Sequence, residues 1–213
     1  MDKKFKVFYL LLLLCLSGFQ TCNAQLRESK IHPVGGPCEG CQAIYEYGNR
    51  ELFPVDTLPG FESNEPKLRI SGVVFAKDGK TPAENVILYI YHTNREGIYQ
   101  TNGTETGWDK RHGFIRAWVK TGKDGRYAFY TFRPAPYQDG SEPEHIHLTV
   151  KEPGINPYYL DDFFFEDDPL LSPEKISNLE NRGGSGIVKP VWNDGILTVH
   201  RDIVLGKNIP GYE

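Results

Sequence analysis

The sequence predicts a mainly β protein, organised as an antiparallel two-sheet β-sandwich over residues 67–213. From residue 69 onward, short runs rich in β-branched and aromatic residues alternate with turn signals, which is typical of all-β folds. These runs cover residues 69–76, 85–93, 114–120, 126–132, 145–151 and 196–205. Two packed sheets can bury one face of every strand. A chain of 213 residues can build a sizeable core in one such domain.

Two Asp-Gly dipeptides lie between predicted strands. Asp78-Gly79 and Asp124-Gly125 favour tight turns, because glycine adopts positive φ without steric cost, and we expect hairpins at both. Residues 158–165, with the sequence YYLDDFFF, are expected to form an edge strand with one face buried. Residues 172–182 fit a short surface helix, and no amphipathic helix of core length is predicted.

Residues 1–24 have the pattern of a secretory signal peptide. Three lysines precede an apolar run over residues 7–16, and small and polar residues follow up to Ala24. The apolar run is shorter than the roughly 20 residues of a membrane-spanning helix, so no membrane span is expected. We expect export to the periplasm or the extracellular space after cleavage near Ala24. A lipid anchor on Cys22 is the less favoured alternative, because bulky or polar residues precede it.

Removal of this segment makes the remaining chain more acidic. It takes away three Lys and one Asp, so the formal net charge falls from -4 to -6. Proteins that bind nucleic acid need a basic surface that releases counterions from the phosphates. The charge therefore argues against nucleic acid as a partner.

Residues 25–66 form a region of their own, rich in Gly, Pro and charged residues and without a sustained helical or strand period. We expect an N-terminal arm, extended or looped, that lies on the sandwich. The arm contains Cys38 and Cys41, the two cysteines that remain after residues 1–24. In an oxidising compartment a local disulfide is the favoured interpretation of this CxxC pair. The alternatives are a redox-active pair and half of a zinc site.

His145 and His147 are candidate metal ligands. They are one residue apart in a predicted strand, so a period of two places both imidazoles on one face and Ile146 on the other. Tyr137 follows a rigid Pro-Ala-Pro, eight residues before His145. A glycine and a proline bend the loop between them, so the tyrosine can fold back onto the histidines. A His-x-His pair by itself is also common as ordinary surface or hydrogen-bonded histidine.

Two segments resemble the core of the intradiol ring-cleavage dioxygenases. Residues 114–150, FIRAWVKTGKDGRYAFYTFRPAPYQDGSEPEHIHLTV, are similar to that family's sequence of an Arg, a glycine turn, a short strand, a Pro-Tyr turn and HIH. Residues 71–99, SGVVFAKDGKTPAENVILYIYHTNREGIY, resemble the family's first two core strands, which end in an iron-binding tyrosine. The motifs are specific together, because four ligand types recur in order with the turn chemistry between them.

The resemblance implies a ferric site with four protein ligands. Tyr99 and His145 match the family's equatorial ligands, and Tyr137 and His147 match its axial ligands. A phenol has a pKa of about 10, so only a strongly Lewis-acidic cation would hold two tyrosines as phenolates at neutral pH. Hard anionic oxygen ligands favour Fe(III), and imidazole also suits iron.

The implied activity is that of a non-haem, Fe(III)-dependent intradiol dioxygenase, an oxidoreductase of aromatic compound catabolism. Its substrates would be O2 and a small aromatic diol of the catechol type, whose ring would be cut between the two hydroxylated carbons. Tyr137 would act as a catalytic base toward a substrate proton. Arg116 is the second candidate catalytic residue, as a cation that stabilises charge on the substrate.

One position departs from the family pattern. Three residues before the first histidine, where the family usually has an arginine, this chain has Glu142. Either Arg116, Arg95 or Arg133 supplies the missing cation, or turnover is slow, or the substrate differs.

The departure keeps two rival functions open. One is a non-catalytic secreted β-sandwich that binds a ligand on the family scaffold. The other is a hydrolytic zinc site, which is disfavoured because zinc sites rarely use paired tyrosines. The sequence does not identify the catechol derivative, nor the oligomeric state, for which a homodimer is one option.

Overall fold

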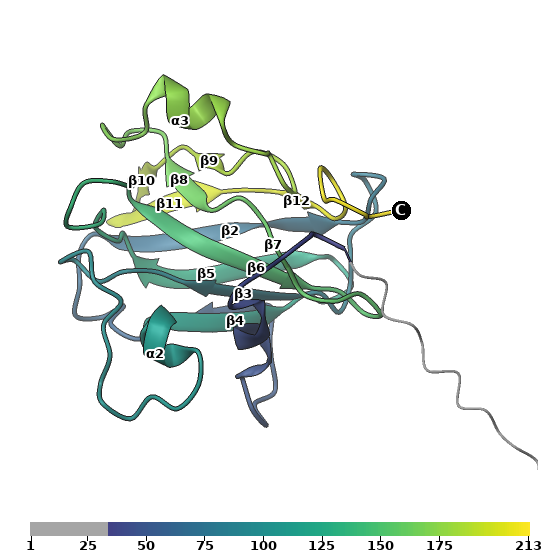
Figure 1. Cartoon of the computed structure of the whole chain (residues 1–213), viewed down its shortest axis with the longest axis horizontal. Coiled ribbons are helices and arrows are strands. Elements are labelled where there is room, and N and C mark those ends of the chain that lie inside the picture. Colours follow the sequence, from purple (N-terminus) through teal and green to yellow (C-terminus); the bar gives the residue numbers. More distant parts are fainter. Residues whose placement is uncertain (1–33) are drawn as a thin grey trace, which may run out of the picture. The chain divides into compact units, whose positions relative to one another are not determined.

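The computed structural model describes residues 34–213, which fold into two packed β-sheets (Figure 1). The predicted mainly β, two-sheet architecture is confirmed. The helices are short: η1 (Cys41–Tyr45), α2 (Asp109–His112) and α3 (Pro173–Ser177). Within residues 34–213, no helix has the length and apolar character needed to cross a membrane. The predicted signal peptide lies outside the described residues.

The strands of each sheet come from distant parts of the chain. The first sheet has the order β1 (Val55–Thr57), β5 (Arg126–Phe132), β2 (Lys67–Phe75), β11 (Ile196–His200) and β10 (Val191–Asn193), with β12 (Ile203–Val204) beside β2. The second sheet has the order β4 (Arg116–Lys120), β3 (Ile87–Tyr91), β6 (His145–Lys151), β8 (Phe163–Phe165) and β9 (Ile187–Val188), with β7 (Tyr158–Tyr159) beside β6.

The two Asp-Gly turns are present, and the first forms a short hairpin: Phe75 and Pro82 pair in an antiparallel bridge across Asp78-Gly79, whereas no paired strands flank Asp124-Gly125. Gly79 and Gly125 both have a φ of 66°. The turns lie on the connections from β2 to β3 and from β4 to β5, and each connection passes from one sheet to the other. The hairpin expectation is thus confirmed at Asp78-Gly79 and wrong at Asp124-Gly125, because a turn signal sets the local reversal of the chain and not the partner of the next strand. Both sheets also contain parallel pairs beside the antiparallel ones.

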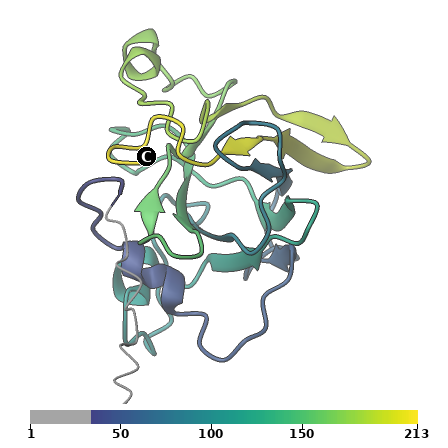
Figure 2. The same cartoon turned by 90° about the vertical axis from the view of Figure 1, so that its right-hand side faces the viewer.

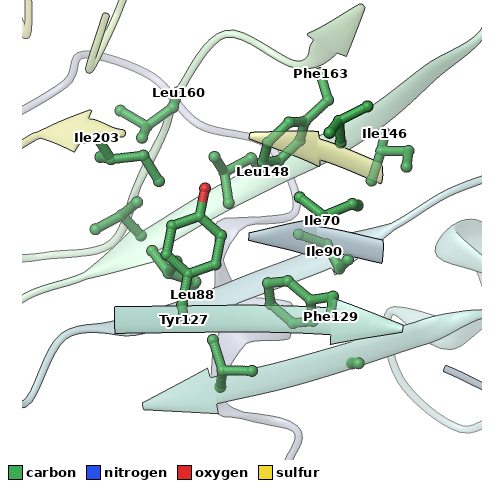
Figure 3. Close-up of a cluster of buried hydrophobic side chains, with 14 of the residues drawn as sticks. Ile70, Leu88, Ile90, Tyr127, Phe129, Ile146, Leu148, Leu160, Phe163 and Ile203 are labelled. Carbon is green, nitrogen blue, oxygen red and sulfur yellow. The ribbon is translucent and has the colours of Figure 1, made fainter. Parts of the chain in front are cut away.

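The core lies between the two sheets. Ile70 and Phe129 from the first sheet pack with Ile90, Leu148 and Phe163 from the second (Figure 3), and all five are buried. Along β2, buried and half-exposed residues alternate as the period-two pattern predicts. Burial of such side chains is the main favourable contribution to folding.

The described part of the N-terminal arm covers the outer face of the second sheet. Ala43 and Ile44 of η1 pack against Tyr89 and Trp118, and the Trp118 indole nitrogen donates to the Ala43 carbonyl at 3.3 Å. Figure 2 shows η1 (purple) at the lower left of the view and α3 (green) at its top. The arm also contributes β1, which pairs in parallel with β5. The sequence pattern did not indicate this strand, because three residues are too few to show a period.

Residues 158–165 form two strands instead of one edge strand. Both β7 and β8 pair with β6, and β8 lies inside the sheet because β9 covers its other side. All three phenylalanines of β8 are buried. The short helix expected in residues 172–182 is present as α3, and the Ser172 hydroxyl caps it by accepting from the Lys175 amide at 3.1 Å.

His92 is a buried histidine at the end of β3. Its Nδ1 donates to the Thr93 carbonyl and its Nε2 accepts from the Thr131 hydroxyl, each at 2.7 Å. A carbonyl oxygen can only accept, so this pair of bonds fits the neutral ring. Burial lowers the pKa of His92 to about 4, because the charged ring would lose its hydration.

We predict that His92 makes the fold less stable in mild acid. The folded ring stays neutral down to about pH 4, whereas in the unfolded chain it gains a proton below its ordinary pKa of 6.5. The unfolded state then binds more protons, so about 3 kcal/mol of unfolding free energy is lost as the pH falls through this range.

Urea unfolding at several pH values checks this prediction. The difference in unfolding free energy between the wild type and His92→Gln should become smaller as the pH falls. His200→Gln, at an exposed histidine, is the control, and its unfolding free energy should change with pH as that of the wild type does. Parallel curves for the wild type and His92→Gln would contradict it.

Candidate metal centre

β6 presents His145 and His147 on the face opposite the core. Ile146 and Leu148 point into the core and are buried, as the period of two predicts. His147 pairs across the sheet with Tyr91 of β3. The two imidazoles meet almost at right angles, and their Nε2 atoms are 3.2 Å apart.

Two loops bring Tyr99 and Tyr137 to these histidines. The loop after β3 carries Tyr99, and the loop after β5 carries Tyr137. The Thr93 hydroxyl donates to the Ala135 carbonyl at 2.7 Å, and the Ala135 amide donates to the Asn94 carbonyl at 3.2 Å. These bonds join the two loops at residues that precede Tyr99 and Tyr137 in the chain.

The loops approach so closely that a side chain at Gly97 would not fit. Gly97 has a φ of +74°, and a Cβ there would lie 2.2 Å from the Pro136 carbonyl oxygen. Arg95 also crosses between the loops and donates to the carbonyls of Arg133 and Pro134 at 2.8 and 3.1 Å. The positions of the two tyrosines are therefore linked through the backbone.

The four side chains that the sequence singled out as ligands meet at one place. The Tyr99 hydroxyl lies 2.7 Å from the Tyr137 hydroxyl and 2.6 Å from His147 Nε2. His145 closes the group through its contact with His147 and an edge-on contact with the Tyr137 ring, at a centroid distance of 5.0 Å. We call these residues the four-donor cluster.

The outer nitrogens of both imidazoles are already occupied. His145 Nδ1 lies 2.7 Å from the Pro143 carbonyl, and His147 Nδ1 lies 3.1 Å from Oδ1 of Asp162. Both partners are acceptors, so each neutral ring holds its proton on Nδ1, and the Nε2 of His147 accepts from the Tyr99 hydroxyl. The Nε2 of His145, 3.2 Å from that of His147, is then an unprotonated nitrogen inside the cluster, to which a cation could bind. The donor set therefore fits a metal ion.

Asp162 was not predicted as part of the site. The ligand atoms of His145, His147 and Asp162 lie within 4.8 Å of one another. Because the carboxylate bonds Nδ1 of His147, on the other side of the ring from Tyr99, we assign Asp162 as the partner that orients His147 and not as a ligand. Burial acts to raise the pKa of Asp162, but the His147 ring and its hydrogen bond outweigh this effect and hold the pKa below its usual value.

The segment that carries Asp162 is anchored from two sides. The guanidinium of Arg201 donates to the Asp161 carbonyl at 2.6 Å. The Asp161 carboxylate accepts the backbone N–H groups of Asn181 and Arg182 at 2.7 and 3.2 Å. These buried bonds fix the backbone next to Asp162 and thus the direction of its carboxylate.

Burial sets the protonation states of the cluster. It raises the pKa of both Tyr99 and Tyr137, and the hydrogen bond to Tyr137 raises that of Tyr99 further. Burial lowers the pKa of His145, and the neighbouring His147 acts in the same direction. Both phenols are therefore neutral in the free protein, and they would bind as phenolates only to a strongly Lewis-acidic ion.

A cleft of about 550 Å³ opens beside the cluster. Tyr137, His145 and His147 line one end of it, whereas Tyr99 does not. The apolar part of the wall consists of Tyr159, Leu160, Phe164 and Leu179. Its size is that of ordinary small-molecule sites and accommodates an aromatic ring.

Arg116 lies apart from the four donors. Its guanidinium pairs with Glu46 at 2.5 Å and with Asp109 at 3.4 Å. In the strand register Tyr91 stands between Arg116 and His147. The catalytic role of Arg116 stays a prediction that this geometry does not support.

The cation of the cleft comes from a residue that the sequence did not indicate. Neither Arg95 nor Arg133 lines the cleft, and Arg133 is held by two carboxylates. Among the described residues that line it, Lys175 of α3 is the one lysine or arginine. Lys175 forms an ion pair with Glu142, 33 residues earlier. Such a distant pairing has no local signal in the sequence.

The CxxC loop lies behind His147. Cys38 and Cys41 are joined by a disulfide with their Cα atoms 5.6 Å apart. A hollow of about 300 Å³ lies between this loop and His147. Tyr91 stacks between His147 and His112, at centroid distances of 4.4 and 3.8 Å. The arm and its aromatic neighbours thus back the ring of a candidate ligand.

Comparison with known proteins identifies the family. A family model described as Dioxygenase matches residues 57–183, which include the four-donor cluster and Asp162. The chain is 27% identical over 142 residues to protocatechuate 3,4-dioxygenase beta chain from Burkholderia cepacia and 28% identical over 123 residues to catechol 1,2-dioxygenase 1 from Acinetobacter lwoffii. The chain belongs to the intradiol dioxygenase family.

The likeness to other intradiol dioxygenases is partial. The two alignments cover 61% and 49% of this chain, and the chain spans 60% and 37% of the relatives' own lengths. The dioxygenase domain of a dioxygenase carbohydrate-binding protein fusion from the cellulolytic Streptomyces sp. SirexAA-E has the same fold, with a TM-score of 0.54 and 21% identity over 73% of this chain and 89% of that one. The predicted family membership is thereby confirmed.

We predict that Asp162→Asn weakens metal binding about tenfold or more, because the amide is a poorer acceptor for His147 Nδ1 and orients the ring less firmly. The dissociation constant of a transition-metal ion, measured by competition with a chelator, checks this. Asp124→Asn, at an exposed carboxylate, is the control and should bind like the wild type. Equal affinity in Asp162→Asn and the wild type would show that Asp162 does not orient the ring.

Proposed function

We propose that this protein is a non-haem Fe(III) intradiol dioxygenase. It would bind an aromatic diol of the catechol type and cut the ring between the two hydroxylated carbons. Both atoms of O2 would enter the product, a muconate-type diacid with two new carboxyl groups. The observation that carries this proposal is the meeting of two phenol oxygens and two imidazole nitrogens at the end of a cleft.

Tyr99, Tyr137, His145 and His147 would hold the ferric ion in this proposal. Bound there, the ion would serve as a Lewis acid that makes the catecholate reactive toward O2. The two phenolate ligands would offset most of its charge, which favours the trivalent over the divalent state. Asp162 would keep the His147 ring oriented through its Nδ1.

Tyr137 is the phenol best placed to take a proton from the diol. It lines the cleft together with the two histidines, whereas Tyr99 does not line the cleft and borders a smaller hollow with Tyr137 and His147. Burial raises the pKa of Tyr137 in the metal-free protein, so its phenolate would be a ready proton acceptor once released from the ion. Tyr99 would remain a ligand throughout, because its hydroxyl is enclosed between Tyr137 and His147.

The alternative of a non-catalytic binding module rests on Glu142, a carboxylate at the position where the family usually has an arginine. The ion pair with Lys175 weakens that basis, because a cation beside the carboxylate offsets its charge. The geometry therefore favours the enzyme over the module.

We predict that Tyr99→Phe and Tyr137→Phe each remove a visible absorption band. Phenolate bound to ferric iron absorbs visible light, so the wild type loaded with iron should be red-brown, and each variant should lose colour and most of its turnover. Tyr45→Phe, at an exposed tyrosine of η1, is the matched control. Iron analysis, absorption spectra and O2 uptake with catechol, protocatechuate and hydroxyquinol provide the measurements. Iron content and spectrum unchanged in the double variant would contradict the proposal.

We also propose that the protein acts outside the cytoplasm, on the basis of the signal-like residues 1–24. Expression of the full chain should yield an exported protein whose mass corresponds to a chain that begins at Gln25. A lipid-modified Cys22 would show the anchored alternative. A cytosolic protein that retains residues 1–24 would contradict export.

A further inference from the structure

An ion pair faces the candidate substrate cleft. Glu142 belongs to the loop between Tyr137 and β6, and Lys175 belongs to α3. Both line the cleft with the metal-site histidines, and their side chains form an ion pair. The Lys175 ammonium also lies 5.9 Å from the ring centroid of Phe164 on the cleft wall. The pair is partly shielded, with 28% of the Lys175 side chain and 36% of the Glu142 side chain exposed.

The carboxylates of the cleft outnumber its one cation. Glu142, Asp161, Asp162 and Glu180 line it, against Lys175 alone among the lysines and arginines of the described residues. The Asp161 carboxylate accepts hydrogen bonds from backbone N–H groups, and the Asp162 carboxylate is bonded to His147. The Lys175 ammonium forms its ion pair with Glu142. The cleft therefore offers no unpaired ammonium or guanidinium group to an incoming anion.

A charged ring substituent would disturb this balance. The carboxylate of a dihydroxybenzoate is ionised at neutral pH and needs a cation once it leaves bulk water. It would have to share the one ammonium of Lys175 with Glu142 or displace Glu142 from it, so two carboxylates would face a single cation in the cleft. A catechol without a charged substituent needs no such cation, and its ring can lie against the apolar wall of the cleft.

We propose that the Glu142–Lys175 pair makes the cleft select aromatic diols with uncharged ring substituents over dihydroxybenzoic acids. This inference rests on the proposed function and adds the substrate class to it. The two relatives differ in this respect, because one is named for protocatechuate, an aromatic acid, and the other for catechol. Glu142 is then a specificity-determining residue that acts by occupying Lys175.

Substitutions on the two sides of the pair test the inference. Glu142→Gln frees Lys175, so the ratio of kcat/KM for 3,4-dihydroxybenzoate to that for catechol should rise about tenfold or more. Lys175→Gln leaves Glu142 unpaired, and the same ratio should fall. The double variant is neutral at both positions and should lie between the single variants. Glu174→Gln, at an exposed residue of α3 outside the cleft, is the control and should keep the wild-type ratio.

Anaerobic calorimetry of the iron-loaded protein gives a readout that does not depend on turnover. The ratio of the association constant for 3,4-dihydroxybenzoate to that for catechol should move in the same direction as the kcat/KM ratio in each variant. A wild type that prefers 3,4-dihydroxybenzoate, or a ratio that is equal in all variants, would overturn the inference and leave the proposed function intact. A wild type that binds neither diol and consumes no O2 would overturn the proposed function and this inference together.

Discussion

The hydrogen bonds between the loop after β3 and the loop after β5 are the constraint on which the site depends. Thr93 and Asn94 bond Ala135 across the gap, and the bare backbone of Gly97 lies against Pro136. Because Tyr99 and Tyr137 follow directly on these contacts, neither phenol can move far without the other. β6 supplies the two imidazoles from a strand whose other face is locked in the core. A rigid sheet and a pair of joined loops thus define one point in space.

The fold also sets the orientation of the imidazole rings at this point. A backbone carbonyl and a carboxylate hold the outer nitrogens of the imidazoles, so the inner nitrogens face the tyrosines. Arg201 is buried far from solvent and yet contributes to the site, because it secures the backbone beside Asp162. On the other side, Tyr91 and His112 stack behind His147 under the CxxC loop. The N-terminal arm is therefore part of the support of the site and not only a cover.

The local patterns in the sequence predicted the strands and the face on which His145 and His147 lie, because both follow from a period of two. The resemblance to the intradiol dioxygenases predicted Tyr99 and Tyr137 as ligands, which residue spacing alone could not do. Asp162 and Lys175 escaped prediction, because the first depends on how the segment before β8 returns beside β6 and the second on where a five-residue helix lies. For the same reason the sequence suggested Arg116, Arg95 and Arg133 as cations for the cleft, and the structure places none of them there.

The central claim is that one metal ion is held by Tyr99, Tyr137, His145 and His147. An anomalous difference map from crystals of the iron-loaded protein, measured at the iron absorption edge, tests it most directly. We expect a single peak within bonding distance of both phenol oxygens and both Nε2 atoms, with Asp162 bonded to His147 and not to the ion. A peak on the Asp162 carboxylate, at the CxxC loop or at any place away from the tyrosines would contradict the account.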